Sequence, residues 1–255
     1  MTETLPMRRW MPTGSALPDT EPSRDLYQKA LSALLRAGAG FSVLKDGVYT
    51  LKDARKRILA VFKPQDEEHN VKLLDCHLSD AAFTGQGSHR EYLAYMLDAH
   101  APLKCRAGVP PTVLVTIDDV RFFGGKPKSG MLSMWVENQG PAEDFGSSCF
   151  TASDVQRLAL FDLRTLNLDR HGSNILVNSQ NRLVPIDHGC ALPESLAEPW
   201  LDWRLWPQAA QPIAQLADNL SESILTLDPY QAKGLVQQLG LPPGVWKVYA
   251  FMTKL

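Results

Sequence analysis

The sequence lacks the features by which membrane-spanning, disulfide-bonded and nucleic-acid-binding proteins are usually identified. No apolar run approaches the roughly 18–20 residues that a membrane-spanning helix needs. Only 4 of the 255 residues are cysteines, and their scattered positions form neither a C-x-x-C pair nor a zinc-binding pattern. The formal net charge is −2, so no overall basic field favours binding to nucleic acid.

These absences are typical of an ordinary intracellular globular protein. The scattered thiols fit a reducing compartment, and the first residues, MTETLPMRRWMPTG, lack the apolar core of a secretion signal. We therefore expect a cytoplasmic protein that makes at most peripheral contact with membranes and binds no nucleic acid. The length allows one large domain or two lobes. Residues 1–23 are rich in Pro, Thr, Ser and Gly, which predicts a flexible N-terminal tail.

The most informative segment spans residues 166–192, LNLDRHGSNILVNSQNRLVPIDHGCAL. Its two short apolar runs, ILV and LVPI, flank a polar turn and predict a β-hairpin. Asp169 and Asn174 precede the first run, and Asp187 follows the second. Polar side chains that a catalyst could use therefore stand at both ends of the predicted hairpin.

The same side chains have the identity and spacing of a phosphoryl-transfer site. Transfer from a nucleotide needs a carboxylate at the attacking hydroxyl and oxygen ligands for Mg²⁺. Protein kinases supply these groups as D-x-x-x-x-N followed by a D-F-G aspartate. Here Asp169 and Asn174 have the first spacing, and Asp187-His188-Gly189 stands in place of the second motif. The alternative is a surface hairpin flanked by loop-forming Asp and Asn residues.

A second hairpin, predicted from the β-rich runs 48–51 and 58–63, ends at Lys63 in the sequence A-V-F-K. Protein kinases hold the lysine that pairs with the α- and β-phosphates on such a strand, in V-A-I-K. The same pattern also fits an ordinary lysine at the end of a strand. No G-x-G-x-x-G phosphate loop occurs in the chain, and Gly47 is the only glycine near the turns of this region. Backbone amides of a different loop would have to cover the phosphates.

A helix predicted to begin at Ser88, over SHREYLAYMLDAH, leaves two roles open for Glu91. Ser88 and Glu91 have the S-x-x-E spacing of a capping box, in which Glu91 closes the helix N-terminus. Alternatively, Glu91 is the helix carboxylate that pairs with the nucleotide-binding lysine, here Lys63, as it does in kinases. The ion pair is the favoured interpretation, and the two roles compete for one side chain.

Segment 131–137, MLSMWVE, predicts a strand that runs into a linker at 138–141, NQGP. In a two-lobed kinase the hinge lies at this position, and an adenine ring would bond the backbone near Trp135 and Val136. The same residues also fit a plain apolar strand.

Two later segments have apolar patterns that bear on the site. Ser153 is the predicted N-cap of an apolar helix that delivers the Asp169 loop. Trp200, Trp203 and Trp206 recur at every third residue, which places them on roughly one side of a helix. Such a stripe fits a buried core face and also a membrane interface, where Trp is favoured.

Together these motifs resemble the phosphatidylinositol 3-/4-kinase superfamily, and most of all its type II and plant gamma-type phosphatidylinositol 4-kinase-like members. The resemblance rests on AVFKPQDEE at 60–68, GSHREYLAYMLD at 87–98, GVPPTVLV at 108–115, the LNLDRHGSNILV loop, and LVPIDHGCALPE at 183–194. The D-R-H-x-x-N order of the loop is the most specific element, because protein kinases have H-R-D instead.

The resemblance implies an α+β, two-lobed, protein-kinase-like fold. Residues 24–137 would form a β-rich N-lobe, and residues 138–255 a mainly helical C-lobe that is shorter at its end than in relatives. It also implies transfer of the γ-phosphate of ATP, with Mg²⁺, to a hydroxyl, and the family default acceptor is the 4-hydroxyl of phosphatidylinositol. The alternatives are a protein Ser/Thr kinase of the same fold and a nucleotide-binding pseudokinase that acts as a scaffold.

Site roles follow from the resemblance by position. On the nucleotide side, Lys63 would hold the phosphates and take part in catalysis. Glu91 would orient Lys63, and the backbone at Trp135 and Val136 would contact adenine.

In the catalytic loop the resemblance implies that Asp169 is the catalytic aspartate and that His171 lies near the transferred phosphate. Asn174 and Asp187 would hold magnesium. A packing role for His171 stays equally open from the sequence.

Overall fold

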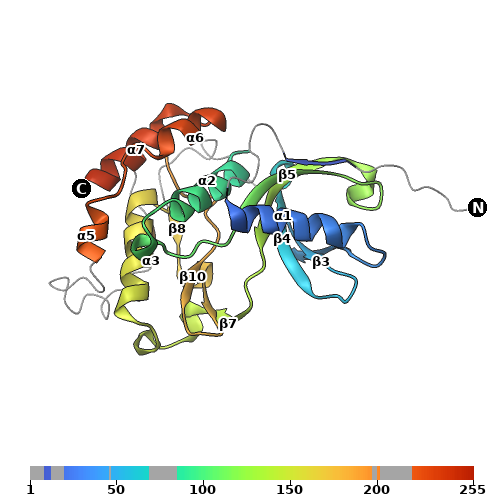
Figure 1. The fold of residues 1–255 in the computed structure, drawn as a ribbon, viewed down its shortest axis with the longest axis horizontal. Coiled ribbons are helices and arrows are strands. Elements are labelled where there is room, and N and C mark those ends of the chain that lie inside the picture. Colours follow the sequence, from blue (N-terminus) through green and yellow to red (C-terminus); the bar gives the residue numbers. More distant parts are fainter. Residues whose placement is uncertain (1–8, 13–19, 46, 69–84, 197–199, 202–219) are drawn as a thin grey trace, which may run out of the picture. The chain divides into compact units, whose positions relative to one another are not determined.

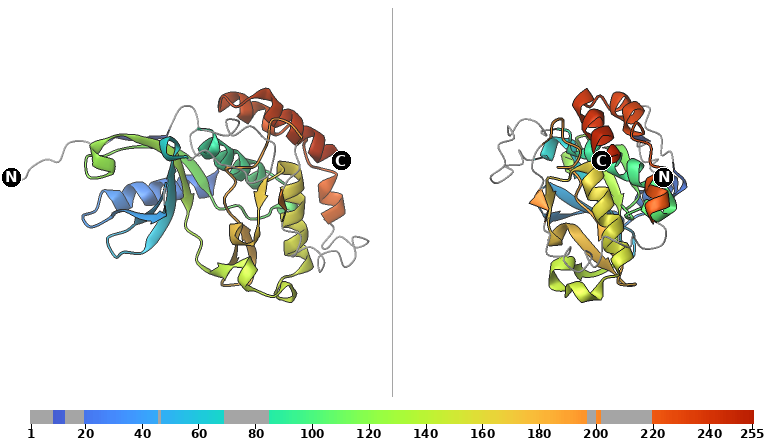
Figure 2. Two further views of the ribbon diagram at one scale, coloured as in Figure 1. Left: turned by 180° about the vertical axis from the view of Figure 1, so that it is seen from behind. Right: turned by 90° about the vertical axis from the view of Figure 1, so that its left-hand side faces the viewer.

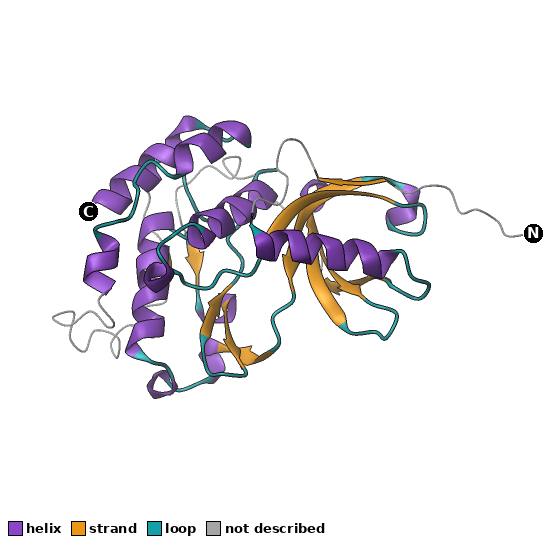
Figure 3. Ribbon diagram, in the orientation of Figure 1, coloured by secondary structure: helices purple, strands orange, loops and turns teal. Residues whose placement is uncertain are grey.

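The computed structural model describes residues 9–12, 20–45, 47–68, 85–196, 200–201 and 220–255 (Figure 1). The chain divides into two compact units. Unit 1 comprises Met1–His69 and Pro111–Trp135, and unit 2 comprises Asn70–Pro110 and Val136–Leu255. Strands dominate unit 1 and helices dominate unit 2 (Figure 3), so the predicted α+β class is confirmed.

An antiparallel sheet with the strand order β1-β5-β6-β4-β3-β2 forms the body of unit 1. Its strands are β1 (Arg9–Pro12), β2 (Gly40–Lys45), β3 (Val48–Lys52), β4 (Ile58–Pro64), β5 (Thr112–Asp118) and β6 (Lys128–Met134). The short 3₁₀ helices η1 (Gln65–Glu67) and η3 (Phe123–Gly125) belong to the same unit. The predicted hairpin that ends at Lys63 is confirmed as β3 and β4, in which Tyr49 lies opposite Phe62.

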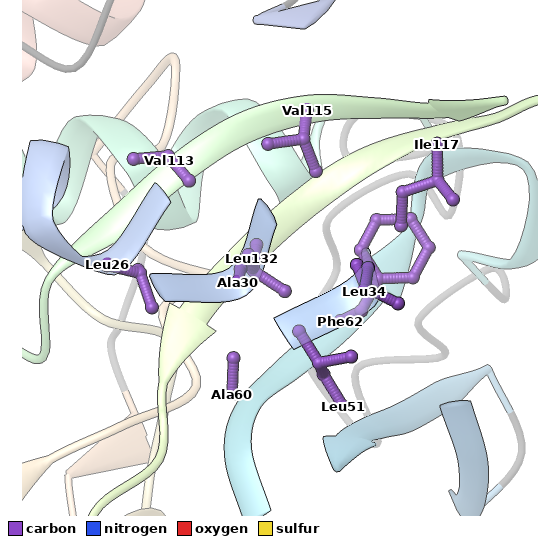
Figure 4. Close-up of a cluster of buried hydrophobic side chains, with 10 residues drawn as sticks. All are labelled: Leu26, Ala30, Leu34, Leu51, Ala60, Phe62, Val113, Val115, Ile117 and Leu132. Atoms are coloured by element: carbon purple, nitrogen blue, oxygen red, sulfur yellow. The ribbon is translucent and has the colours of Figure 1, made fainter. Parts of the chain in front are cut away.

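Helix α1 (Glu21–Leu34) covers one face of this sheet (Figures 1 and 2). The core between them consists of buried residues from α1 and four strands (Figure 4), namely Leu26, Ala30, Leu34, Leu51, Ala60, Phe62, Val113, Val115, Ile117 and Leu132. Successive residues of a strand point to opposite faces. Because Ala60 and Phe62 point toward α1, Lys63 projects from the other face of the sheet.

The predicted flexible tail over residues 1–23 is wrong where the structure describes it. Arg9–Pro12 form β1, which pairs with β5, and α1 begins at Glu21, inside the predicted tail. Thr20 caps this helix, because its Oγ1 accepts a hydrogen bond from the Ser23 N–H at 3.3 Å and its own N–H donates to Ser23 Oγ at 3.2 Å. Residues 1–8 and 13–19 lie outside the described part of the chain.

Unit 2 combines helices with two small sheets. Its α-helices are α2 (Gly87–Ala99), α3 (Ala152–Thr165), α5 (Leu220–Ile224), α6 (Ala232–Gln238) and α7 (Pro243–Lys254). Its 3₁₀ helices are η2 (Leu103–Cys105), η4 (Ala142–Asp144), η5 (Ser147–Cys149) and η6 (Gly172–Asn174). Strands β7 (Asn138–Pro141), β9 (Ile175–Asn178) and β10 (Leu183–Pro185) form one sheet, and β8 (Asp169–Arg170) pairs in parallel with β11 (Trp200–Leu201).

The segment with α2 belongs to unit 2, whereas the sequence predicts a continuous N-lobe over 24–137. The reason is the apolar side of α2. Leu93 and Leu97 pack in one core with Ala191, Leu192 and residues of α6 and α7. Although α2 lies between β4 and β5 in the sequence, it belongs to the helical unit 2, because the residues that bury its leucines come from the last third of the chain.

The predicted hairpin in residues 166–192 is confirmed as β9 and β10, which pair antiparallel with Leu176 opposite Val184. The linker expected at 138–141 is instead β7, the third strand of this sheet. The Gln139 side chain helps to hold it, because Nε2 donates to the Asn178 carbonyl oxygen at 2.7 Å.

Helix α3 leads into the segment that contains Asp169, as predicted, but its N-cap is Thr151 and not Ser153. Thr151 Oγ1 accepts a hydrogen bond from the Asp154 N–H at 3.1 Å. At the other end Leu166 adopts a left-handed conformation with φ of 43°, which turns the chain out of the helix.

No helix in the described residues is both long and apolar enough to cross a membrane. Trp203 and Trp206 of the predicted tryptophan stripe lie outside the described residues. The backbone of Trp200 lies in the short strand β11 and not in a helix.

Candidate active site

The segment from Asp169 to Asn174 folds back on itself so that three predicted site residues meet. Asp169 begins β8, and Asn174 ends η6. The Asn174 amide nitrogen Nδ2 donates to the Asp169 carbonyl oxygen at 2.9 Å and lies 3.1 Å from His171 Nε2. His171 Nε2 is 3.7 Å from Asp169 Oδ1, and both side chains are about one-third exposed. A carboxylate, an imidazole and an amide are thus grouped at an accessible place on unit 2.

These hydrogen bonds fix which end of the Asn174 amide can serve as a metal ligand. A carbonyl oxygen can only accept, so the group bonded to the Asp169 carbonyl must be the amide NH₂. The side-chain oxygen Oδ1 is then the end that can bind a cation. Oxygen is the ligand atom that Mg²⁺ prefers, which fits the predicted role.

Arg170 lies buried between the two segments that carry the predicted metal ligands. Its guanidinium bonds to both carboxylate oxygens of Asp162 on α3, at 3.2 and 3.0 Å. Its Nη1 donates to the carbonyl oxygens of Asn174, at 2.5 Å, and Ile186, at 2.8 Å. Burial raises the pKa of Asp162, and the positive charge of Arg170 opposes that shift. One side chain therefore ties Asn174 to the residue that precedes Asp187.

Asn167 makes a second connection between the two segments. It is fully buried. Its Oδ1 accepts from the Asp169 N–H at 3.0 Å, and its Nδ2 donates to the Asp187 carbonyl oxygen at 3.4 Å. Asp187 itself has a positive φ of 57°, uncommon for a residue other than glycine. The strained backbone at Asp187, the predicted metal ligand, turns the chain away from the end of β10.

Within unit 2, Glu91 contacts His188, a partner that neither sequence interpretation names. Its Oε2 accepts from the His188 backbone N–H at 2.9 Å and lies 3.4 Å from His188 Nδ1. The His188 ring is buried and stands edge-on to Phe161, with 5.5 Å between the ring centroids. The capping-box interpretation is wrong, because α2 begins one residue earlier, with Gln86 as its N-cap and no side-chain cap bond.

Lys63 lies on β4 of unit 1, opposite Met131 of β6. The two strands approach each other closely beside it, at Gly130. A Cβ atom on Gly130 would lie 2.7 Å from the Cα of Pro64 and closer still to the carbonyl oxygen of Lys63. Only glycine fits here without moving the backbone that carries the lysine.

The residues that follow Lys63 form a polar cluster with the neighbouring strands. Lys128 Nζ bonds to Asp66 at 2.8 Å and to Glu67 at 2.5 Å, and Tyr49 Oη donates to Glu67 at 2.7 Å. Gly47, in the turn between β2 and β3, lies so close that a Cβ there would be 2.9 Å from the Glu67 carbonyl oxygen. The cluster and this close approach hold η1 against the turn between β2 and β3. The sequence of this turn is not that of a glycine-rich phosphate loop.

At the predicted hinge, part of the backbone is already used. The Trp135 N–H donates to the Leu59 carbonyl oxygen at 3.0 Å, and the Val136 carbonyl oxygen accepts from Asn138 Nδ2 at 2.8 Å. The adenine contact expected at Trp135 and Val136 stays a prediction.

Comparison with known proteins decides the family. The family model described as phosphatidylinositol 3- and 4-kinase matches residues 46–242, more than half of the chain. The chain belongs to this family. The family consists of phosphotransferases, so the resemblance inferred from the motifs and the kinase-like fold are both confirmed.

Several plant proteins are similar in sequence to this member of the phosphatidylinositol 3- and 4-kinase family. Phosphatidylinositol 4-kinase gamma 4 of Oryza sativa subsp. japonica is 38% identical over 187 residues, which cover 65% of this chain and 33% of the relative. Phosphatidylinositol 4-kinase gamma 1 of Arabidopsis thaliana is 34% identical over 256 residues, covering 89% of this chain and 43% of the relative. The chain thus spans less than half the length of these relatives.

Among solved structures, a MAP kinase from Leishmania major aligns over 66% of this chain and 50% of its own length. The sequence identity is 12% and the TM-score is 0.32, a similarity too low to support a conclusion.

Every site residue predicted from the sequence of this family member lies in the described part of the chain. Unit 2 brings Asp169, His171 and Asn174 into contact and links Asp169 to Asp187 through Asn167. Glu91 lies in the same unit, next to the residue after Asp187. Lys63 and Trp135 belong to unit 1.

Three supporting residues were missed by sequence reasoning, namely Asn167, Arg170 and His188. A signal existed for each. Asn167 is a polar residue between two leucines, Arg170 is the middle of D-R-H, and His188 replaces the apolar residue of D-F-G. None of these signals names a partner, because the partners come from α2, from α3 and from backbone carbonyls.

The donor set fits a magnesium ion that is shared with a nucleotide. Asn174 and Asp187 offer one amide oxygen and one carboxylate. In the described residues no group of three or more His, Cys, Asp or Glu side chains could hold a metal ion. Mg²⁺ is commonly bound by one or two carboxylates together with substrate phosphates, without a complete protein cage.

Proposed function

We propose that this chain transfers the γ-phosphate of ATP to a hydroxyl group, with phosphatidylinositol as the first acceptor to test. The observation that carries the proposal is the grouping of Asp169, His171 and Asn174 and their connection to Asp187 through buried Asn167 and Arg170. The lipid acceptor is supported by the relatives, whose names identify them as phosphatidylinositol 4-kinases.

The reaction needs few groups from the protein. The acceptor oxygen forms a bond to the γ-phosphorus while the bond between that phosphorus and the ADP oxygen breaks, and the acceptor proton passes to the Asp169 carboxylate. Lys63 would hold the phosphates through charge-assisted hydrogen bonds. Asn174 Oδ1 and the Asp187 carboxylate would hold Mg²⁺, which neutralises phosphate charge when bound. Catalysis then rests on positioning and charge stabilisation.

His171 and Glu91 have supporting roles in this proposal. His171 lies beside Asp169 and Asn174, and because its Nε2 accepts from the Asn174 NH₂ group, its Nδ1–H is the atom that would donate to the transferred phosphate. One oxygen of Glu91, Oε2, faces His188. The orientation of Lys63 by Glu91, which the resemblance implies, stays a prediction.

The decisive experiment measures transfer of labelled γ-phosphate from Mg-ATP. Phosphatidylinositol vesicles and a mixed protein substrate are offered in parallel. We expect label in the lipid, and we expect Asp187→Ala to lower the rate by about a hundredfold or more, because it removes a metal ligand. The matched control is Asp118→Ala, which removes an exposed carboxylate at the end of β5 and should leave the rate unchanged.

The other outcomes identify the alternatives. Label in protein, including the chain itself, would assign a Ser/Thr acceptor. Label in neither substrate, with a melting temperature that ATP still raises, would assign a nucleotide-binding pseudokinase. Equal turnover in wild type and Asp187→Ala would refute the assigned site.

A further inference from the structure

The two residues between His171 and Asn174 are contacted by one residue from another segment of unit 2, Glu143. Glu143 lies in η4, directly after β7, whereas Gly172 and Ser173 lie in η6. Ser173 and Glu143 are both exposed, and the Ser173 hydroxyl donates a hydrogen bond to Glu143 Oε1 at 2.7 Å. This bond joins the 169–174 loop to a segment that precedes it by about 30 residues.

Gly172 packs against the same glutamate. It is buried, and a Cβ atom on it would lie 2.7 Å from Glu143 Cβ and 3.2 Å from both the Cα and the backbone nitrogen of Glu143. Gly172 does not have the left-handed backbone conformation that favours glycine. The close approach to Glu143 is therefore the reason that a side chain does not fit here.

The segment that carries Glu143 is fixed in the core of unit 2. Ala142, the preceding residue, is fully buried and packs in one cluster with Ile175 of β9. Pro141 lies opposite Leu176 where β7 pairs with β9. Glu143 thus contacts the 169–174 loop from a backbone that is held to the strand that follows this loop.

We propose that Glu143 is a positioning residue for the predicted metal ligand Asn174. The place of Asn174 Oδ1 depends on the course of the backbone through Gly172 and Ser173, and Glu143 contacts both of them. A displacement of about 1 Å in an active site can lower the rate on the order of a hundredfold. The proposal rests on the proposed function, because it concerns magnesium bound together with ATP.

The two contacts of Glu143 differ in strength. Water can replace the exposed hydrogen bond from Ser173, so this bond contributes little by itself. The packing of Gly172 cannot be relieved in the same way, because the atoms it meets are Cβ and the backbone of Glu143. Variants at the two positions should therefore have effects of different size.

The test measures the Kd for ATP by calorimetric titration, once with excess Mg²⁺ and once with EDTA, and also the rate of phosphate transfer. In Gly172→Ala the new methyl group must displace η6 from Glu143. We expect the Kd with Mg²⁺ to rise about tenfold and the rate to fall about a hundredfold. The Kd in EDTA should not change, because Asn174 is proposed to hold only the metal. Loss of folded protein alone would leave the ratio of the two Kd values unaltered.

Variants at the exposed positions test the hydrogen bond. Glu143→Ala and Ser173→Ala should each raise the Kd with Mg²⁺ about twofold to tenfold, and the double variant should not exceed either one. Glu143→Gln keeps an acceptor for the Ser173 hydroxyl and should behave like wild type. The matched control, Asp144→Ala, removes the neighbouring exposed carboxylate of η4 and should leave both Kd values unchanged.

Two results would overturn the proposal. One is a Kd ratio in folded Gly172→Ala equal to that of wild type, and the other is a wild-type affinity for ATP that does not depend on Mg²⁺. If Gly172→Ala does not fold by circular dichroism, the comparison of Glu143→Ala with wild type decides in its place. A changed Kd ratio without phosphate transfer by wild type would support the role of Glu143 and refute the proposed function.

Discussion

Glu91 accepts a hydrogen bond from the backbone N–H of His188, 2.9 Å away, and lies 3.4 Å from the Nδ1 atom of the same residue. Helix α2 is thereby joined to the residue that directly follows the proposed metal ligand Asp187. A displacement of α2 would move Asp187 as well, even though Glu91 need not touch the metal. Glu91 is thus a positioning residue for the proposed metal ligand Asp187.

Replacing Glu91 should lower the stability of the fold. In Glu91→Ala the buried N–H and imidazole of His188 lose their acceptor, which should cost about 1–3 kcal/mol. Urea unfolding measures this loss. Glu222→Ala removes an exposed glutamate from α5 and serves as the control. If both variants unfold at the same urea concentration, the contact between Glu91 and His188 does not contribute to stability.

The ion pair between Asp162 and Arg170 should show strong coupling. Arg170→Met leaves Asp162 as a buried, unpaired carboxylate, which should cost about 3–5 kcal/mol. The double variant Asp162→Leu with Arg170→Met removes both charges and should be more stable than the single variant. Unfolding free energies of the two variants test this, and a double variant no more stable than Arg170→Met would contradict the prediction.

Lys63 should act on nucleotide affinity. Lys63→Met removes one charge-assisted hydrogen bond to phosphate, worth about 1.5–3 kcal/mol, so the Kd for ATP should rise by roughly tenfold to a hundredfold. Calorimetric titration with ATP measures the change. Lys45→Met removes an exposed lysine from β2 of the same sheet and should leave the Kd unaltered.

The polar cluster of Lys128, Asp66 and Glu67 predicts that the free energy of unfolding falls at alkaline pH. Burial of Lys128 opposes its charged form, but the hydrogen bonds and charges of Asp66 and Glu67 outweigh this, and its pKa lies above 10.5. A lysine with a raised pKa in the folded state contributes its full stabilisation below pH 10.5 and loses it as the pH rises through the folded value. The pKa of Tyr49 is also raised, first by its hydrogen bond to Glu67 and then by burial, and it acts in the same direction.

The corresponding experiment compares wild type and Lys128→Met by urea unfolding from neutral pH upward. The stability difference between them should be constant at first and should shrink above pH 10.5. The exposed Lys126→Met variant controls for general effects of losing a lysine. A difference that grows with pH would mean that the cluster lowers the pKa of Lys128 instead.

The sequence predicted those features of the structure that depend on residues close together in the chain. The hairpin of β9 and β10 follows from a polar turn between two apolar runs, and the spacing of Asp169 and Asn174 lies within one loop. The pairing of β1 with β5 did not follow, because it joins segments about a hundred residues apart. The assignment of α2 to unit 2 failed for the same reason, since the partners of Leu93 lie beyond residue 190.

The supporting contacts of the site were unpredictable for a different reason. Arg170 binds a carboxylate of α3 and two backbone carbonyl oxygens, and a backbone carbonyl has no signature in the sequence. The role of Glu91 depends likewise on a backbone N–H, that of His188.

The close packing of Gly130 against the backbone of Lys63 offers a genetic tool. An alanine at this position must push β4 and β6 apart, so it would displace the lysine without altering any side chain proposed to contact the nucleotide. Such a distortion is better tolerated in the cold than near the unfolding temperature. A Gly130→Ala allele should therefore be temperature-sensitive, and shifting a culture between two temperatures would switch the protein off in living cells.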